Sequence, residues 1–166
     1  MTLVVYVGGA RSGKSRLALE RARACGAPVV FVATGEGLDD EMADRIARHK
    51  AERPADWQTV EEPRELERAV ADAPPDATVV VDCLSLWVAN VFEKEAAEEL
   101  GARAAARAAG RPGLTIAVTN EVGLGIVPDN SLARRYRDVL GRVNATWAAA
   151  AGEAYFVVAG RALRLE

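Results

Sequence analysis

The sequence has very few of the residues that build metal clusters and disulfide frameworks. Cys25 and Cys83 are the only cysteines among 166 residues, and His49 is the only histidine. Two thiols without ligand spacing indicate neither a zinc site nor a disulfide scaffold. We therefore expect reduced thiols in a cytoplasmic protein, because disulfides persist mainly in oxidising compartments.

Long apolar runs and a large excess of one charge are also missing. The apolar run at residues 3–7 is far too short to span a bilayer, and no basic segment precedes it as in a signal peptide. The net charge of −3 gives no general attraction to nucleic acid or to an anionic membrane. We expect neither as a partner, so any anion site must come from a local arrangement.

What the sequence does contain is an alternation of short apolar runs and helix-favouring segments. Runs without polar alternation predict buried strands at residues 3–7, 29–33, 78–81 and 114–118, and residues 59–61 fit a further short strand. Composition and end signals predict helices at residues 14–25, 39–53, 63–73, 85–109 and 130–151, with the fourth interrupted near Gly101 and the third opening at Pro63. Residues 154–158 and 162–165 predict a terminal hairpin.

This order of elements predicts the fold class. Half of the residues are hydrophobic, which is enough for one core in one domain spanning residues 1–166. Buried strands that are each followed by a helix favour an α/β fold: a mainly parallel sheet with helices on both faces, ending here in an antiparallel hairpin.

The most specific pattern is a glycine-rich segment between a predicted strand and a predicted helix. It matches G-x-x-x-x-G-K-[ST] without a gap and consists of Gly8, Gly9, Ala10, Arg11, Ser12, Gly13, Lys14 and Ser15. The N–H groups of such a P-loop and the following helix N-terminus form a phosphate site. We expect Lys14 to reach the β- and γ-phosphates and Ser15 to ligate Mg²⁺. A glycine turn with a chance lysine is the weaker alternative, and Arg11 suits a phosphate contact and a solvated loop equally well.

A second metal ligand is predicted where the apolar run at residues 78–81 ends in Asp82. A carboxylate in this position downstream of a P-loop can hold Mg²⁺. The alternative is that Asp82 caps the helix that follows.

His49 has two interpretations. Met42, Ile46 and His49 share one face of the predicted helix, which favours a histidine packed at the edge of the core. Alternatively, an imidazole with an ordinary pKa of about 6.5 is mostly neutral in the cytoplasm and can attack an α-phosphate. Cations that suit such a role lie nearby, at Arg45, Arg48, Lys50 and Arg53. From these residues alone the packed histidine is favoured.

The segment at residues 120–128 follows a predicted strand, where open α/β sheets bind ligands. Its glycines, Gly123 and Gly125, permit close approach of the backbone to a bulky ligand. An ordinary turn-rich connection is the alternative.

Taken together, segments spread over almost the whole chain resemble the bifunctional adenosylcobinamide kinase / adenosylcobinamide-phosphate guanylyltransferase family. They are residues 8–15, 33–35, 39–42, 45–46, 49–50, 53–54, Trp57, Glu61, 119–128, 137–138 and 141–144. The P-loop occurs in many families, whereas the segment around His49 and the loop at residues 120–128 are far more specific. Residues 93–112 match least well.

The resemblance implies a RecA-like P-loop fold, a homo-oligomer that is a trimer, and two reactions. First, ATP or GTP phosphorylates the hydroxyl of the aminopropanol arm of adenosylcobinamide. Second, GTP transfers GMP to that phosphate through a guanylyl-histidine, giving adenosylcobinamide-GDP and pyrophosphate. His49 is then the guanylylated residue, which reverses the preference stated above.

The resemblance also implies which residues contact the nucleotides. They are residues 8–15 of the P-loop together with Ala33, Thr34, Gly35, Lys50, Ala51, Glu52, Arg53, Glu61 and Asp82. Lys14 and His49 are the expected catalytic residues, Ser15 and Asp82 the expected Mg²⁺ ligands, and the corrinoid the expected partner. Two alternatives stay open: a different small-molecule P-loop kinase in which His49 is structural, and a nucleotide-dependent switch module.

Overall fold

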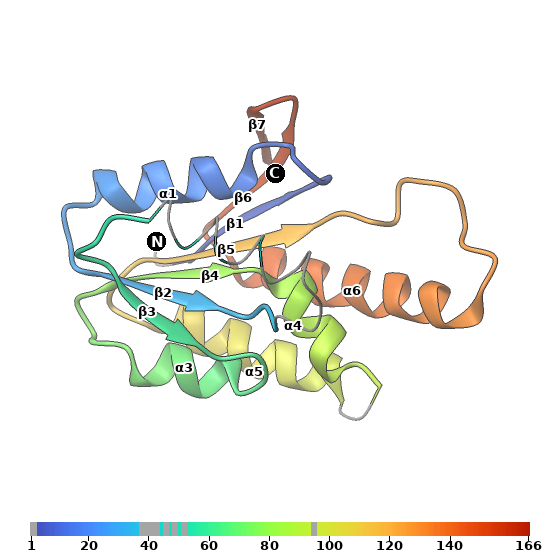
Figure 1. Cartoon of the computed structure of the whole chain (residues 1–166), viewed down its shortest axis with the longest axis horizontal. Helices are drawn as coiled ribbons and strands as arrows, with labels where there is room; N and C mark the ends of the chain where they lie inside the picture. The colour runs from blue at the N-terminus through green and yellow to red at the C-terminus, as the bar shows by residue number, and fades with distance from the viewer. Residues whose placement is uncertain (1–2, 37–43, 45–46, 48–49, 51–52, 94–95) are drawn as a thin grey trace.

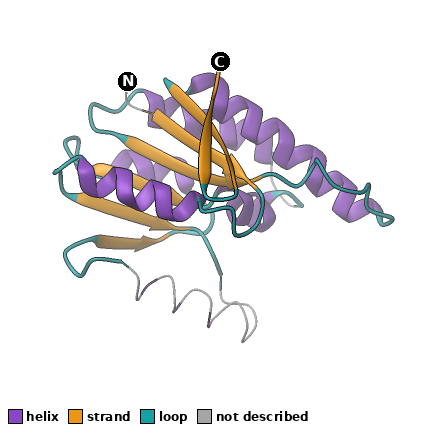
Figure 2. Ribbon diagram, turned by 90° about the horizontal axis from the view of Figure 1, so that it is seen from above, coloured by secondary structure: helices purple, strands orange, loops and turns teal. Residues whose placement is uncertain are grey.

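The chain folds around one seven-stranded sheet in the order β3-β2-β4-β5-β1-β6-β7. The structure is a computed structural model that describes residues 3–36, 44, 47, 50, 53–93 and 96–166. Its strands are β1 (Leu3–Gly8), β2 (Val29–Ala33), β3 (Gln58–Glu61), β4 (Thr78–Asp82), β5 (Thr115–Asn120), β6 (Glu153–Val158) and β7 (Arg161–Leu165). All neighbours pair in parallel except β6 and β7, which form the antiparallel hairpin that ends the sheet (Figure 2).

Helices cover both faces of this sheet, so the predicted fold class is confirmed. The described helices are α1 (Lys14–Ala24), α3 (Leu66–Asp72), α4 (Leu84–Val91), α5 (Ala97–Ala109) and α6 (Ser131–Ala150). Helix α1 lies on one face and α3, α5 and α6 lie on the other (Figure 1). None of the described helices is long and apolar enough to cross a membrane.

Strands β1, β2, β4 and β5 are buried on both sides, which explains their continuous apolar sequences. Within β1, Leu3 and Val5 belong to the core cluster beneath α3–α6. Val4 and Tyr6 belong to the cluster beneath α1. The two clusters cover opposite faces of the sheet. The parallel strands all end at the same edge of the sheet, and the candidate site lies at that edge.

The break in the predicted helix 85–109 is not at Gly101, as the sequence suggested. It falls between Val91, where α4 ends, and Ala97, where α5 begins, while Gly101 is buried inside α5. A Cβ at Gly101 would lie 3.3 Å from a methyl group of Val143 in α6. This glycine therefore serves close helix packing and does not interrupt the helix, a distinction that local sequence cannot make.

The third predicted helix also begins later than Pro63. Helix α3 starts at Leu66, because the side chain of Glu62 accepts the N–H groups of Arg64 and Glu65 at 3.0 Å each. Pro63 is used differently: its carbonyl accepts a hydrogen bond of 3.0 Å from the side chain of Asn90.

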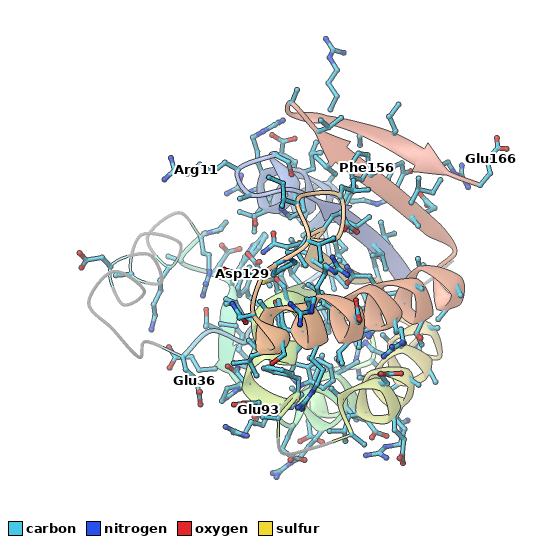
Figure 3. The ribbon with its side chains drawn as sticks, turned by 90° about the vertical axis from the view of Figure 1, so that its right-hand side faces the viewer. Arg11, Glu36, Glu93, Asp129, Phe156 and Glu166 are labelled. Carbon is cyan, nitrogen blue, oxygen red and sulfur yellow. The ribbon has the colours of Figure 1, made fainter. Side chains whose placement is uncertain are left out.

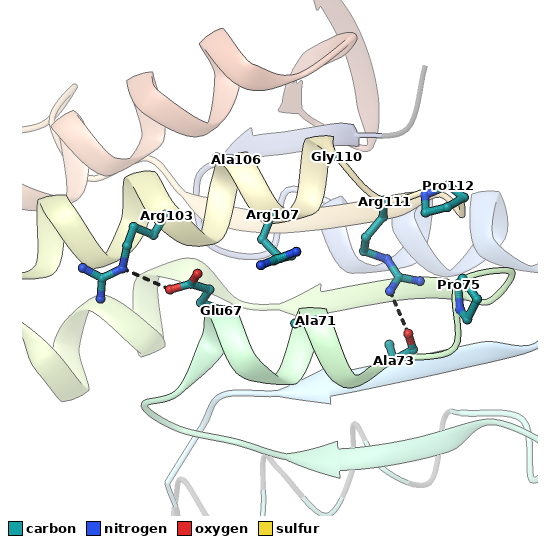
Figure 4. Close-up of a pocket in the computed structure, with 10 residues that line it drawn as sticks. All are labelled: Glu67, Ala71, Ala73, Pro75, Arg103, Ala106, Arg107, Gly110, Arg111 and Pro112. Carbon is teal, nitrogen blue, oxygen red and sulfur yellow. Dashed lines mark hydrogen bonds and ion pairs between the residues drawn. The ribbon is translucent and has the colours of Figure 1, made fainter.

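Arg111 forms hydrogen bonds both to the end of α3 and to the turn that leads into β4. Its guanidinium is buried and donates to carbonyl oxygens at 2.9–3.0 Å, those of Val70, Ala73, Pro74 and Ala77. Burial lowers the pKa of Arg111. Arg107 lines the same groove of about 500 Å³ between α3 and α5 (Figure 4), but it has no hydrogen bond or ion pair with the residues that the structure describes.

We expect Arg111→Met to lower the free energy of unfolding by about 3 kcal/mol, because buried carbonyl oxygens lose charged donors. Arg107→Met is the matched control, and its effect should stay below about 0.5 kcal/mol. Urea titrations of both variants measure the difference. Equal destabilisation would show that the guanidinium of Arg111 has no special structural role.

Candidate functional site

The glycine-rich segment lies between β1 and α1, as its sequence predicts. Helix α1 begins at Lys14, and the residue before it, Gly13, has a left-handed backbone conformation with φ of 98°. The side chain of Lys14 is only 6% exposed. Its ammonium donates to the carbonyl oxygen of Gly9 at 2.6 Å, so it folds back over the loop that would hold a phosphate.

Segments from far along the chain hold this loop in place. The N–H of Gly160 in the C-terminal hairpin donates to the carbonyl of Ser12 at 2.8 Å, and the N–H of Glu121 donates to the carbonyl of Gly8 at 3.0 Å. A Cβ at Gly8 would lie 2.2 Å from the carbonyl oxygen of Val157 in β6. The close approach of β6 therefore requires glycine at position 8.

Asp82 ends β4 at the same edge of the sheet, in register with Ala33 of β2. Thr34 links these two strand ends: its hydroxyl donates to the carbonyl of Cys83 at 2.7 Å and accepts the N–H of Cys83 at 2.9 Å. Its own N–H donates to the carbonyl of Asp82 at 3.3 Å. The structure thus joins Ala33 and Thr34 to the end of β4 at Asp82 and Cys83, and the nucleotide contacts of these residues stay predictions.

Asp82 is not the N-cap of the helix that follows. The N-cap of α4 is Cys83, and its own side chain makes no capping hydrogen bond. A hydroxyl on Ser15 at the start of α1 and a carboxylate on Asp82 are hard oxygen ligands of the kind that Mg²⁺ takes. Because Mg²⁺ at such sites keeps waters and binds nucleotide phosphates, two protein ligands are enough. The residues present therefore fit the ion.

Arg53 lies half-buried at the edge of this site. Its guanidinium sits 3.7 Å from the centre of the Phe31 ring, and its Nε is buried without a hydrogen-bond partner among the described residues. Burial lowers the pKa of Arg53, while the charges of Asp82 and Glu61 act in the opposite direction. Lys50 is exposed and pairs with Glu61 at 3.1 Å. Arg53, Lys50 and Glu61 are thus brought together.

His49, Ala51 and Glu52 lie outside the described residues, as do Met42 and Ile46 of the helical stripe. Both interpretations of His49 therefore stay predictions.

A network of buried polar side chains was not predicted residue by residue. The amide of Asn120, at the end of β5, donates to the hydroxyl of Ser85 at 3.0 Å, and that hydroxyl lies 3.0 Å from the thiol of Cys83. Burial raises the pKa of the Cys83 thiol to about 11. A thiol that stays protonated is a poor nucleophile, so Cys83 has a structural part. Asn and Ser are common in loops, and only their position at strand ends could have singled them out.

Lys14→Ala should weaken binding of a nucleoside triphosphate about tenfold or more, because a charge-assisted contact to the phosphates is lost. Titration with a fluorescent GTP analogue in the presence of Mg²⁺ measures the dissociation constant. An affinity within threefold of the wild type would contradict the assigned position of the phosphates.

Asp82→Ala should raise the Mg²⁺ concentration needed for half-maximal nucleotide binding by about tenfold, since a carboxylate ligand is lost. Asp76→Ala removes an exposed aspartate just before β4 and is the matched control. Thermal melts should be unchanged for both. A Mg²⁺ titration that does not move in Asp82→Ala would remove this residue from the metal site.

Comparisons with known proteins give one consistent result. The sequence profile of a family described as cobinamide kinase / cobinamide phosphate guanyltransferase matches residues 3–165. A Salmonella typhimurium protein named bifunctional adenosylcobalamin biosynthesis protein CobU is 40% identical over 183 residues, covering 99% of each chain. A Pseudomonas aeruginosa protein named bifunctional adenosylcobalamin biosynthesis protein CobP is 42% identical over 166 residues, covering 98% of this chain and 96% of the relative.

Solved structures with similar folds are much more distant in sequence. The flagellar accessory protein FlaH from Methanocaldococcus jannaschii superposes with a TM-score of 0.56 at 16% identity, covering 99% of this chain and 78% of its own. A KaiC-like protein from Pyrococcus horikoshii gives a TM-score of 0.53 at 16% identity, covering 93% and 70%. These likenesses extend to the P-loop fold only.

Proposed function

The chain belongs to the cobinamide kinase / cobinamide phosphate guanyltransferase family, and from this premise we propose that it catalyses both reactions in turn. A nucleoside triphosphate phosphorylates adenosylcobinamide, and GTP then transfers GMP to the new phosphate, giving adenosylcobinamide-GDP. The observation that carries the proposal is the buried Lys14 over a P-loop at the same sheet edge as Asp82.

The kinase step uses the P-loop. The oxygen of the acceptor hydroxyl forms a bond to the γ-phosphorus and releases its proton to solvent, while the P–O bond to the β-phosphate breaks and the nucleoside diphosphate leaves. Catalysis of this kind depends on positioning and on stabilising charge. Lys14 and the loop N–H groups would do both, and Ser15 and Asp82 would hold the Mg²⁺ ion. When bound, the ion neutralises charge on the β- and γ-oxygens.

The guanylyl step uses His49 as the nucleophile. The neutral imidazole forms a P–N bond to the α-phosphorus of GTP as the bond to pyrophosphate breaks, and the ring loses its proton. An oxygen of adenosylcobinamide phosphate then forms a P–O bond as the P–N bond breaks and the ring regains a proton, so one difficult displacement becomes two. The half-buried Arg53 and the exposed Lys50 are close to His49 in the sequence, and their positive charge suits the α-phosphate or the leaving pyrophosphate.

A kinase without guanylyl transfer fits the P-loop equally well, but it gives no role to His49 and its neighbouring cations. The relatives' names carry the word bifunctional, which favours two reactions. ATP and GTP as donors, the guanylyl-histidine and a trimer in solution are parts of the same proposal.

His49→Ala should abolish guanylyl transfer and leave the kinase reaction within about threefold of the wild type. The chain has no second histidine to replace it, and the kinase step needs only the P-loop, the metal and the acceptor. Intact-mass spectrometry after mixing with GTP and Mg²⁺ should show one GMP per chain in the wild type and none in the variant. The wild-type adduct should be acid-labile and alkali-stable, as expected for a P–N bond.

Cys25→Ser is the control, because Cys25 is the exposed thiol and its loss should leave the adduct intact. A GMP adduct that persists in His49→Ala would refute the histidine mechanism. Loss of both activities together with a lower melting temperature would instead indicate that His49 is packed in the core.

A further inference from the structure

We propose that the loop at residues 121–130, together with the groove beside it on α6, is the platform that binds the corrinoid acceptor. The inference rests on the proposed function, which makes a corrinoid the substrate. Figure 3 shows this loop, marked by Asp129, running between the phosphate-binding loop at Arg11 and helix α6.

The loop presents apolar side chains to solvent. Leu124 is 79% exposed and Ile126 is 97% exposed, more than any other large apolar side chain that the structure describes. Val127 is 60% exposed, and no charged residue occurs from Val122 to Val127. Exposed apolar residues that are contiguous, unlike scattered ones, mark a surface that another molecule covers.

Both ends of the loop are fixed, so these side chains are held out from the body of the protein. At its start, the amide of Asn144 in α6 donates to the carbonyl of Asn120 at 2.9 Å. At its end, the guanidinium of Arg134 donates to the carbonyls of Pro128 at 2.9 Å and Asp129 at 2.7 Å. Helix α6 therefore anchors the loop at two points, and the geometry is formed before a ligand arrives, which lowers the entropy cost of binding.

An open groove of about 510 Å³ lies between this loop and α6. Small residues at Gly123, Gly141 and Ala145 leave room in it, while Arg137, Asp138 and Arg142 supply charged groups. A Cβ on Gly141 would meet no atom within 4 Å. The groove therefore offers polar groups next to the exposed apolar side chains of the loop.

A corrinoid matches this combination by its chemistry. Its macrocycle is broad and flat with apolar faces, and amide groups project from its edge. The apolar side chains of the loop can cover one face of the macrocycle, while the polar side chains of α6 can form hydrogen bonds with the amide groups at its edge. The loop starts one hydrogen bond from the P-loop, through the N–H of Glu121 and the carbonyl of Gly8, so a flexible arm on the macrocycle is directed toward the phosphates.

The test uses a substitution that fills the groove and one that removes the apolar cover. Gly141→Phe places a ring where the structure has open space, and the double variant Leu124→Ser/Ile126→Ser removes exposed apolar surface without touching the core. Ala149→Phe, at an exposed position of α6 outside the groove, is the matched control. The full-length chain is assayed with adenosylcobinamide, and binding of a fluorescent GTP analogue is measured separately.

We expect the KM for adenosylcobinamide to rise about tenfold or more in both test variants. The nucleotide dissociation constant, the melting temperature and the KM of Ala149→Phe should stay within about twofold of the wild type. Unchanged KM values in the test variants would overturn the inference. So would a parallel loss of nucleotide affinity, or a change of oligomeric state by light scattering, which would make the loop a contact between copies of this chain.

The same assay separates this inference from the function on which it rests. A wild-type chain that fails to turn over adenosylcobinamide would refute the proposed function and this inference with it. Normal turnover in the wild type with unchanged KM values in the variants would refute the corrinoid platform alone.

Discussion

The close approach of β6 to the phosphate-binding loop is the contact on which the site depends. The carbonyl oxygen of Val157 lies so near Gly8 that no side chain fits there. In the turn of the hairpin, the N–H of Gly160 donates to the carbonyl oxygen of Ser12. Backbone groups thus set the loop from two sides before any ligand binds. A phosphate site built from N–H groups needs such rigidity, because its donors must already point at the place where the charge will lie.

The positive character of the site is local and comes from this geometry. The chain as a whole is acidic, yet the carboxyl edge of its sheet gathers a buried lysine and a half-buried arginine. The arginine is stacked on Phe31, and burial lowers its pKa, while the charges of Asp82 and Glu61 act in the opposite direction. Such a guanidinium gains more from a phosphate than a solvated one does, because the interaction forms in a less polar environment.

The sequence predicted most of the fold because the relevant signals are local. The P-loop motif and the continuous apolar strands are both readable within a few residues. The late start of α3 has a local cause, the hydrogen bonds that Glu62 accepts, but the other misses came from long-range contacts. In the sequence Gly101 resembles a helix breaker, whereas in the structure it lies within α5 and allows α6 to pack closely against that helix. The network from Ser85 to Asn120 joins residues 35 positions apart, and the groove on α6 exists only once the loop is placed beside the helix. No local pattern encodes such contacts.

The arrangement divides the binding edge between two groups of elements. The ends of strands β1, β2, β3 and β4 carry most of the candidate nucleotide residues, whereas β5 and α6 flank the loop proposed for the acceptor. Strand β5 lies between β4 and β1 in the sheet. The loop proposed for the acceptor follows β5, so it begins between the P-loop, which follows β1, and Asp82, which ends β4. On the proposed function, an acceptor arm entering from this loop would meet the phosphates between the P-loop and Asp82, where the γ-phosphorus of a bound nucleoside triphosphate would lie. The order of strands would then bring the two substrates together at one place, although the residues proposed to bind them come from separate parts of the chain.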